Sequence, residues 1–297
     1  MTKSVRVAFV GPVVKEYYSE LSGVEFFPNL DSFSEQASVF EVVVYRGEDK
    51  LDENFFKISK RLKLLVKPAV GLDNVDLKAA SARGVQVKNV PDGATISVAE
   101  YVIGALISFL RKLPAANASA KSGKWDRASF HGAELYGKTV GILGLGRIGR
   151  AVASRFKAFG VNLVAYDPYL PLECFDGVKR VNSIPELLST SDIISIHVPL
   201  ESSTKNLFNE ESVAHVKKGA ILINTSRGDV VDEIALIGAL KSGVLSGAIL
   251  DVRAKEPPEK NELLTLKNVM LTPHLAASTN DAQKRIASEV IKIIREF

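Results

Sequence analysis

A glycine-rich turn near the middle of the chain constrains the fold more than any other feature. An apolar run from Thr139 to Leu143 is followed by Gly144-Leu145-Gly146-Arg147-Ile148-Gly149, and a helical pattern of apolar residues then runs to Gly160. This order of strand, glycine turn and helix is typical of a βαβ unit that binds a dinucleotide, because the helix N-terminus faces the pyrophosphate.

The glycines in this turn have separate functions. Gly144 permits the tight turn, Gly146 lets the backbone approach a pyrophosphate, and Gly149 lets the helix pack closely on the strand. We therefore expect the turn and the first helical residues, Arg147 and Ile148, to bind the cofactor.

The next apolar run, Val161 to Tyr166, ends at Asp167, about 20 residues beyond the turn. A carboxylate at this position can accept a hydrogen bond from a ribose 2′-hydroxyl of the adenosine. It would repel a 2′-phosphate, and no arginine immediately follows it. The sequence therefore predicts NAD rather than NADP as the cofactor.

Length and strand patterning indicate two domains. At 297 residues the chain exceeds the usual single domain. Short apolar runs alternate with helical patterns, which predicts parallel α/β sheets. The expected fold class is α/β with two doubly wound parallel sheets, a Rossmann-type NAD-binding domain inserted in a flavodoxin-like substrate domain. Strands are expected at 5–10, 42–45, 62–66 and 85–88 in the first domain, and at 139–143, 161–166, 193–197, 220–224, 247–250 and 269–271 in the second.

The boundaries follow from breaks in this alternation. Pro91-Asp92-Gly93 interrupts the first series, and Ser97 with Glu100 resembles a capping box that opens a long helix to about Leu113. The last segment, Thr279 to Phe297, is expected to be a helix that returns to the first domain. We expect a substrate domain of residues 1–93 plus 273–297 and an NAD-binding domain of residues 94–272.

Composition argues against several classes of partner. The formal charge of +4 is spread along the chain, so neither nucleic acid nor a membrane surface is expected. The start of the chain has no extended apolar signal core, which favours a cytoplasmic protein. The one cysteine, Cys174, can form no internal disulfide and has no partner for a metal site, so no metal is expected.

The candidate chemistry comes from the residues that follow the strands of the second domain. Ligands bind outside the carboxyl ends of strands in doubly wound sheets. An arginine, a carboxylate and an imidazole arrive at this edge beside the dinucleotide turn. The residues found there are Asp167, His197-Val198-Pro199, Thr225-Ser226-Arg227-Gly228, Asp251, Glu256 and Pro273-His274.

Arg227, Glu256 and His274 together suit hydride transfer on an anionic hydroxy acid. Arg227 can hold a carboxylate with a bidentate fork and polarise the neighbouring carbonyl. His274 can take the alcohol proton, and Glu256 can accept the other ring N–H. Arg227 and Glu256 each have a structural alternative, a surface ion pair for Arg227 and an ordinary loop carboxylate for Glu256. His197 can line the nicotinamide site or simply pack.

At this point the sequence resembles a known family, the D-2-hydroxyacid dehydrogenases, over nearly the whole chain. The motifs that carry the resemblance are Leu143 to Gly149, Asn224 to Gly228, Asp251-Val252 through Glu256-Pro257, Thr272-Pro273-His274, Val70 to Asp76 and Gly123 to Arg127. The resemblance implies that Arg227, Glu256 and His274 are catalytic and that Asp251 contacts the nicotinamide carboxamide. It also implies that the backbone at Val70 and Gly71 binds the substrate carboxylate, and that the protein is a homodimer or a tetramer.

The expected cofactor site combines the turn, the strand ends and positions that the resemblance implies. Its residues are Val70, Gly144, Gly146, Arg147, Ile148, Gly149, Asp167, His197, Val198, Pro199, Thr225, Ser226, Arg227, Asp251, His274, Ala276 and Ala277.

Within the family, the chain is most similar to the members that oxidise D-3-phosphoglycerate, the first step of phosphorylated serine synthesis. Arg46 and Lys67 are the candidates for binding the phosphate, and Lys124 or Arg127 of a partner subunit could help. Two positions depart from the family pattern near this site: Glu48 stands where a second arginine is frequent, and Lys67 where arginine is common. Arg253 replaces a frequent aromatic residue.

Other functions remain as alternatives. A glyoxylate or hydroxypyruvate reductase would use the same catalytic residues on a smaller acid. A more remote alternative is an NAD-sensing corepressor or scaffold, since fold alone does not decide function. The resemblance ends at Phe297, so feedback through the regulatory domain of longer members is not expected.

Overall fold

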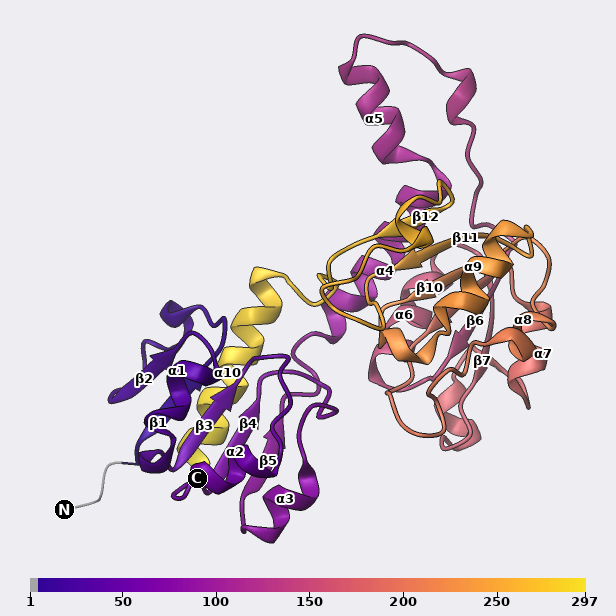
Figure 1. Cartoon of the computed structure of the whole chain (residues 1–297). Coiled ribbons are helices and arrows are strands. Elements are labelled where there is room, and N and C mark those ends of the chain that lie inside the picture. The colour runs from indigo at the N-terminus through magenta and orange to yellow at the C-terminus, as the bar shows by residue number, and fades with distance from the viewer. Residues whose placement is uncertain (1–4) are drawn as a thin grey trace. The chain divides into compact units, whose positions relative to one another are not determined.

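The computed structural model describes residues 5–297, and the chain divides into two compact units. Unit 1 comprises Met1–Ala94 and Ser278–Phe297, and unit 2 comprises Thr95–Ala277, so that unit 2 is an insertion in unit 1 (Figure 1). The second crossing follows Ala277 rather than residue 272. The physical reason is that the backbone N–H groups of Leu275 and Ala276 donate to the Asp251 carboxylate and hold this segment on unit 2.

Unit 1 is built on a five-stranded sheet with the strand order β2-β1-β3-β4-β5. All of its strand pairs are parallel, and this is the flavodoxin-like order. The strands are β1 (Val7–Val10), β2 (Val24–Phe27), β3 (Val42–Tyr45), β4 (Leu64–Lys67) and β5 (Gln86–Asn89).

Alternate side chains of this sheet enter two separate cores. On β3, Val43 and Tyr45 pack with phenylalanines that include Phe33. Val42 and Val44 face the opposite side and pack against the last helix, α10 (Asn280–Glu296). The C-terminal helix therefore does return to the first unit, where it covers one face of the sheet. The helices on the other face are α1 (Leu30–Ser34), α2 (Glu53–Ile58) and α3 (Leu77–Ala82).

Unit 2 contains a seven-stranded parallel sheet with the order β12-β11-β10-β9-β6-β7-β8. Read from β8, this is the doubly wound Rossmann order with one further strand at its end. The strands are β6 (Thr139–Leu143), β7 (Asn162–Tyr166), β8 (Lys179–Arg180), β9 (Ile193–Ile196), β10 (Ala220–Asn224), β11 (Leu245–Leu250) and β12 (Val269–Leu271).

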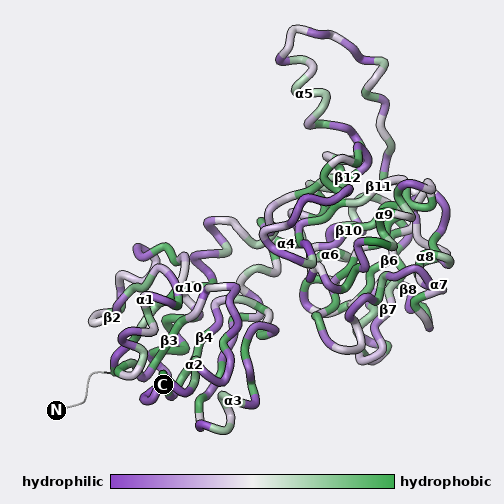
Figure 2. Tube along the Cα trace, viewed as in Figure 1, coloured by the Kyte–Doolittle hydropathy of each residue, from purple (hydrophilic) through white to green (hydrophobic). Residues whose placement is uncertain are grey.

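Helices cover both faces of this second sheet. One face packs on α4 (Thr95–Leu110) and α6 (Arg147–Lys157), and the other on α7 (Ile184–Thr190) and α9 (Glu233–Lys241). The remaining helices are α5 (Leu113–Lys121) and α8 (Glu210–Val213). Figure 2 shows the hydrophobic segments concentrated in the two sheets. Along residues 5–297 no helix combines the length and the apolar character that a membrane crossing needs.

Two expectations about local structure were wrong. The long helix begins at Thr95, so Ser97 lies inside it and is buried instead of capping it. It ends at Leu110, and Lys112 takes a left-handed conformation (φ 52°) before α5 starts. Strands β2 and β8 were not expected from the sequence, because they are edge strands of only four and two residues.

The packing of α10 on the first sheet can be tested with Ile286→Ala. Ile286 is 5 % exposed and lies against β1, β3 and β4 side chains, so truncation should leave a cavity. We expect the free energy of unfolding to fall by about 2–4 kcal/mol in a urea titration. Ser288→Ala, an exposed position on the same helix, should change it by less than about 0.5 kcal/mol. Equal effects of the two substitutions would contradict the packing described.

Candidate active site

The glycine turn lies at the carboxyl end of β6, which is paired with β7 on one side and β9 on the other. The strands that follow β6 in the chain are added first on one side of it, β7 and β8, and then on the other, β9 to β12. Doubly wound sheets bind ligands at such a switch point. Gly144 has φ 89°, and a Cβ there would lie 2.8 Å from the carbonyl oxygen of His197. The turn and the end of β9 are thus in close contact.

The remaining glycines fit a bound pyrophosphate. A Cβ on Gly149 would lie 2.1 Å from the carbonyl oxygen of Gly144, so Gly149 allows α6 to pack against the turn. Around a Cβ on Gly146, by contrast, no atom of the described chain lies within 4 Å. Gly146 is the N-cap of α6, and it has no side chain to occupy the first-turn N–H groups. An anion can therefore approach these donors.

Asp167 fastens the turn to the end of β7. The Leu145 N–H donates to Asp167 Oδ2 over 2.9 Å, and the Tyr169 N–H donates to Oδ1 over 3.0 Å. Each carboxylate oxygen has a further lone pair for a ribose hydroxyl. The donor and acceptor set at this site fits the adenosine and pyrophosphate of NAD.

His274 and Glu256 form a hydrogen-bonded pair from two different loops. Glu256 follows β11 and His274 follows β12, and His274 Nδ1 lies 2.6 Å from Glu256 Oε2. The hydrogen bond to Glu256 raises the pKa of His274 above its ordinary 6.5, although burial acts in the opposite direction. Burial alone would raise the pKa of Glu256, but the hydrogen bonds from His274 and from the Arg253 N–H lower it. The pair favours an ionised glutamate beside a basic imidazole.

Buried Asp251 holds the loop that carries His274. Its side chain is 1 % exposed; Oδ1 accepts hydrogen bonds from the Thr272 hydroxyl and the Leu275 N–H, and Oδ2 accepts one from Ala276 N–H. The Asp251 carbonyl accepts the His274 N–H over 2.8 Å. His274 itself has φ 51°, a conformation that costs a non-glycine residue free energy and needs such support. The observed partners of the Asp251 carboxylate all belong to this loop.

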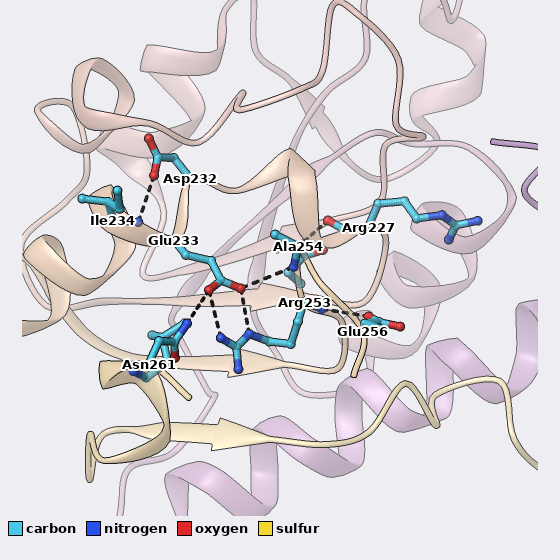
Figure 3. A network of polar contacts seen from close by, with 10 residues as sticks. Arg227, Asp232, Glu233, Ile234, Arg253, Ala254, Glu256 and Asn261 are labelled. Carbon is cyan, nitrogen blue, oxygen red and sulfur yellow. Dashed lines mark hydrogen bonds and ion pairs between the residues drawn. The ribbon is translucent and has the colours of Figure 1, made fainter. Parts of the chain in front are cut away.

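Arg227 reaches the same region from the carboxyl end of β10. Asn224 Nδ2 donates to the Arg227 carbonyl over 2.8 Å, which fixes the turn that follows the strand. The positive charge of Arg227 lowers the pKa values of both Glu256 and His274, so the three groups interact electrostatically. In Figure 3 the Arg227 guanidinium points away from the neighbouring ion pair of Arg253. Unit 2 therefore brings together the three residues expected to be catalytic.

Two other strand-end residues have distinct environments. His197 Nε2 lies 2.8 Å from the Ser195 hydroxyl, and burial lowers the pKa of His197 to about 4, which keeps the ring neutral near pH 7. The Thr225 hydroxyl is buried and makes no hydrogen bond to any residue between 5 and 297. An orphaned hydroxyl beside Arg227 is a position where a bound cofactor or substrate can supply the missing partner.

The expected substrate residues of unit 1 surround a loop after β3. Arg46 donates a hydrogen bond to Gln283 of α10, and burial lowers the pKa of Arg46. Lys67 is 4 % exposed, donates to the Gly47 carbonyl over 3.2 Å and lies over the Tyr45 ring. The Lys67 ammonium thus supports the loop that carries Arg46.

The loop that contains Val70 and Gly71 lies against the same segment. Val70 is exposed, and its carbonyl accepts a hydrogen bond from Asn89 Nδ2. Asn74 Nδ2 donates to the carbonyls of Gly47 and Asp49, 3.1 Å in each case. Asn74 thus joins the two loops. The sequence did not predict this function, and the only indication of it was that Asn74 lies in the motif from Val70 to Asp76.

The cofactor site can be tested with Asp167→Ala. The substitution removes a charged acceptor, so the Kd for NADH should rise about tenfold, as hydrogen bonds to charged groups contribute about 1.5–3 kcal/mol. NADPH should lose less affinity, because the repulsion of its 2′-phosphate is also removed. Calorimetric titration with both cofactors measures the ratio. Glu173→Ala, an exposed carboxylate in the next segment, is the matched control. An unchanged ratio for Asp167→Ala would exclude the ribose contact.

Comparison with known proteins gives consistent matches. Residues 103–276 match the family model of the D-isomer specific 2-hydroxyacid dehydrogenase, NAD binding domain. The chain is 45% identical to the D-3-phosphoglycerate dehydrogenase of Methanocaldococcus jannaschii over 86% of its length and 42% identical to that of Bacillus subtilis over 91%. It spans about half the length of these curated relatives, 50% and 51%.

Solved structures match nearly the whole chain. A glyoxylate reductase from Paecilomyes thermophila has a TM-score of 0.90 at 30% identity, with 99% of this chain and 95% of that one covered. A D-lactate dehydrogenase from Aquifex aeolicus, complexed with NAD and lactic acid, has a TM-score of 0.87 at 29% identity, with 98% and 95% covered. Together with the family model, these matches show that the chain belongs to the D-isomer specific 2-hydroxyacid dehydrogenases and carries their NAD-binding domain.

Proposed function

We propose that this protein catalyses the NAD-dependent oxidation of D-3-phosphoglycerate to 3-phosphohydroxypyruvate. The observation that carries the chemistry is the 2.6 Å pair of His274 and Glu256, within the electrostatic reach of Arg227. The choice of substrate is supported by relatives at 40–45% identity that are named D-3-phosphoglycerate dehydrogenase.

Each of the three residues has a separate function in the proposed reaction. Because His274 Nδ1–H donates to Glu256, the other ring nitrogen, Nε2, is the one that takes the proton of the substrate hydroxyl. The Glu256 carboxylate stabilises the imidazolium that results. Arg227 binds the substrate carboxylate and polarises the developing carbonyl. The turn after β6 and Asp167 would hold NAD, which would supply the hydride acceptor for this oxidation.

Arg46 is our candidate for reading the phosphate, with Val70 and Gly71 supplying backbone contacts to the carboxylate. The hydrogen bond from Arg46 to Gln283 holds the Arg46 guanidinium at the end of β3. A substrate phosphate would accept hydrogen bonds from the other N–H groups of this guanidinium. Lys67 acts on this site through the Gly47 carbonyl.

A glyoxylate or hydroxypyruvate reductase is the second candidate. The observations that favour it are Glu48, a carboxylate in the same loop as Arg46, and the partners that already engage Arg46 and Lys67. The match to a glyoxylate reductase at a TM-score of 0.90 agrees with it. Both candidates use the same catalytic residues.

We further propose that the protein assembles as a homodimer or tetramer through unit 2. In the described chain, α5 buries none of its nine residues, and Trp125 shortly after it is 87% exposed. Exposed apolar surface of this kind is typical of protein interfaces. The other proposed partner is the small-molecule substrate.

A substrate panel tests the proposed activity. We expect NADH formation from D-3-phosphoglycerate when the keto product is trapped, and a higher kcat/KM for 3-phosphohydroxypyruvate than for glyoxylate or hydroxypyruvate. Arg46→Ala should lower kcat/KM about 10–100-fold for the phosphorylated acid alone, as a charge-assisted contact contributes about 1.5–3 kcal/mol. Arg6→Ala, which breaks the exposed pair with Glu25, serves as control. A preference for glyoxylate that Arg46→Ala leaves unchanged would favour the reductase.

The proton-transfer assignment is tested with His274→Ala. Oxidation requires neutral His274, so kcat/KM for oxidation in the unsubstituted protein should rise as pH increases through a pKa above 6.5. The variant should lose about 10²–10⁴-fold in kcat, lose this pH step, and keep its affinity for NADH. Stopped-flow turnover and NADH titration measure these effects. Turnover near the original rate would mean that another group transfers the proton.

A further inference from the structure

An ion pair between a buried arginine and a half-buried glutamate lies next to the catalytic loops. Arg253 follows β11 and is 8 % exposed, at a position where the family resemblance leads one to expect an aromatic residue. Its Nε and Nη2 donate to Oε1 and Oε2 of Glu233, the first residue of α9, over 2.8 and 2.9 Å. The bidentate geometry fixes the direction of the arginine side chain. Figure 3 shows this network beside Glu256 and Arg227.

Glu233 is itself held in place by further donors. Asn261 Nδ2 donates to Glu233 Oε2 over 2.7 Å, and the Ala254 N–H donates to Oε1 over 3.3 Å. The hydrogen bond from Arg253 lowers the pKa of Glu233, so the carboxylate is ionised at neutral pH. The start of α9 therefore anchors the segment from Arg253 to Asn261 at three of its residues.

The backbone of Arg253 connects this anchor to the catalytic groups. The Arg253 N–H donates to Glu256 Oε1 over 2.8 Å, while Glu256 Oε2 is the atom that pairs with His274. A Cβ on Gly228, the residue after Arg227, would lie 1.9 Å from the carbonyl carbon of Arg253. The same backbone thus touches the glutamate of the pair and packs against the loop of the catalytic arginine.

We propose that the Arg253–Glu233 ion pair is a positioning device that aims Glu256 at His274. Its catalytic meaning rests on the function proposed above. Arg253 reaches Glu256 through one hydrogen bond, and Glu256 reaches His274 through a second. The ion pair therefore acts on His274 through Glu256. A loosened Arg253 backbone would let the Glu256 carboxylate turn away, which weakens the interaction that makes His274 basic.

His274 provides a direct readout of this alignment. The charged groups that face it are Glu256, Asp251 and Arg227, and those that face Glu256 are His274 and Arg227. The first two raise the pKa of His274 and Arg227 lowers it. A displaced Glu256 should therefore lower the pKa of His274, whereas a purely structural defect elsewhere on α9 should leave it unchanged.

The experiment is an NMR pH titration of the imidazole groups in the full chain without cofactor or substrate. The chain has only four histidines, and His274→Ala assigns the relevant signal. Glu256→Gln sets the largest shift that loss of the charged partner can produce. Glu233→Gln should lower the pKa of His274 by about 0.5 or more in the same direction. It should also lower kcat and move the acid limb of the oxidation profile to lower pH, with little change in the KM for NAD.

Two further variants make the result decisive. Glu233→Gln leaves a buried arginine without its charged partner, so Glu233→Gln/Arg253→Met, which removes both charges, is measured beside it. Glu262→Gln is the matched control, because it breaks the exposed 2.7 Å pair with Lys241 at the other end of α9.

The outcomes separate the possibilities. A lowered His274 pKa in the folded double variant, with no change in Glu262→Gln, supports the positioning role. A double variant that melts cooperatively and keeps the original His274 pKa and kcat would overturn it. The titration needs no substrate, so it separates the two proposals. If the unsubstituted protein does not oxidise D-3-phosphoglycerate but the double variant still has a lowered His274 pKa, the proposed reaction is wrong and the positioning role is still supported.

Discussion

The buried carboxylate of Asp251 is the interaction on which the catalytic region depends. It accepts hydrogen bonds from three residues of the segment after β12, and its backbone carbonyl accepts the N–H of His274. A buried charge is tolerated only when its acceptor positions are filled, so this segment has little freedom to take another conformation. Asp251 thereby holds His274 at a positive φ and ties the ends of two neighbouring strands together.

Different surroundings give the two histidines at this sheet edge different protonation behaviour. His197 is largely buried, with intermediate exposure, and is paired with the Ser195 hydroxyl, so burial lowers its pKa and the ring stays neutral. His274 is partly exposed and paired with a carboxylate, so its pKa is raised. Of the two, only His274 has a charged partner that stabilises the imidazolium. This contrast gives a physical reason why proton transfer belongs to His274.

Much of the fold could be predicted from local patterns. The runs at Val42–Tyr45, Thr139–Leu143, Ala220–Asn224 and Val269–Leu271 are strands with the predicted bounds, because each is a mainly apolar run in a sheet covered on both faces. Asp232 caps α9 and Ser183 caps α7, and both are residue types favoured at the start of a helix. The edge strands β2 and β8 were missed because they have only four and two residues. The Ser97 pattern was misleading because the two residues before it, from Thr95 on, are already helical, so that Ser97 lies inside α4.

By itself, the sequence determined the dinucleotide turn, the carboxylate at Asp167 and the arrival of Arg227, Glu256 and His274 after strands of one sheet. These follow from backbone geometry and the polarity of parallel strands, which depend on neighbours in the chain. Only the tertiary structure decided that Asp251 supports the histidine segment, that Lys67 supports a loop, and that Glu233 pairs with Arg253. These contacts join residues that are about twenty or more positions apart, so they exist only once strand order and helix packing bring the side chains together.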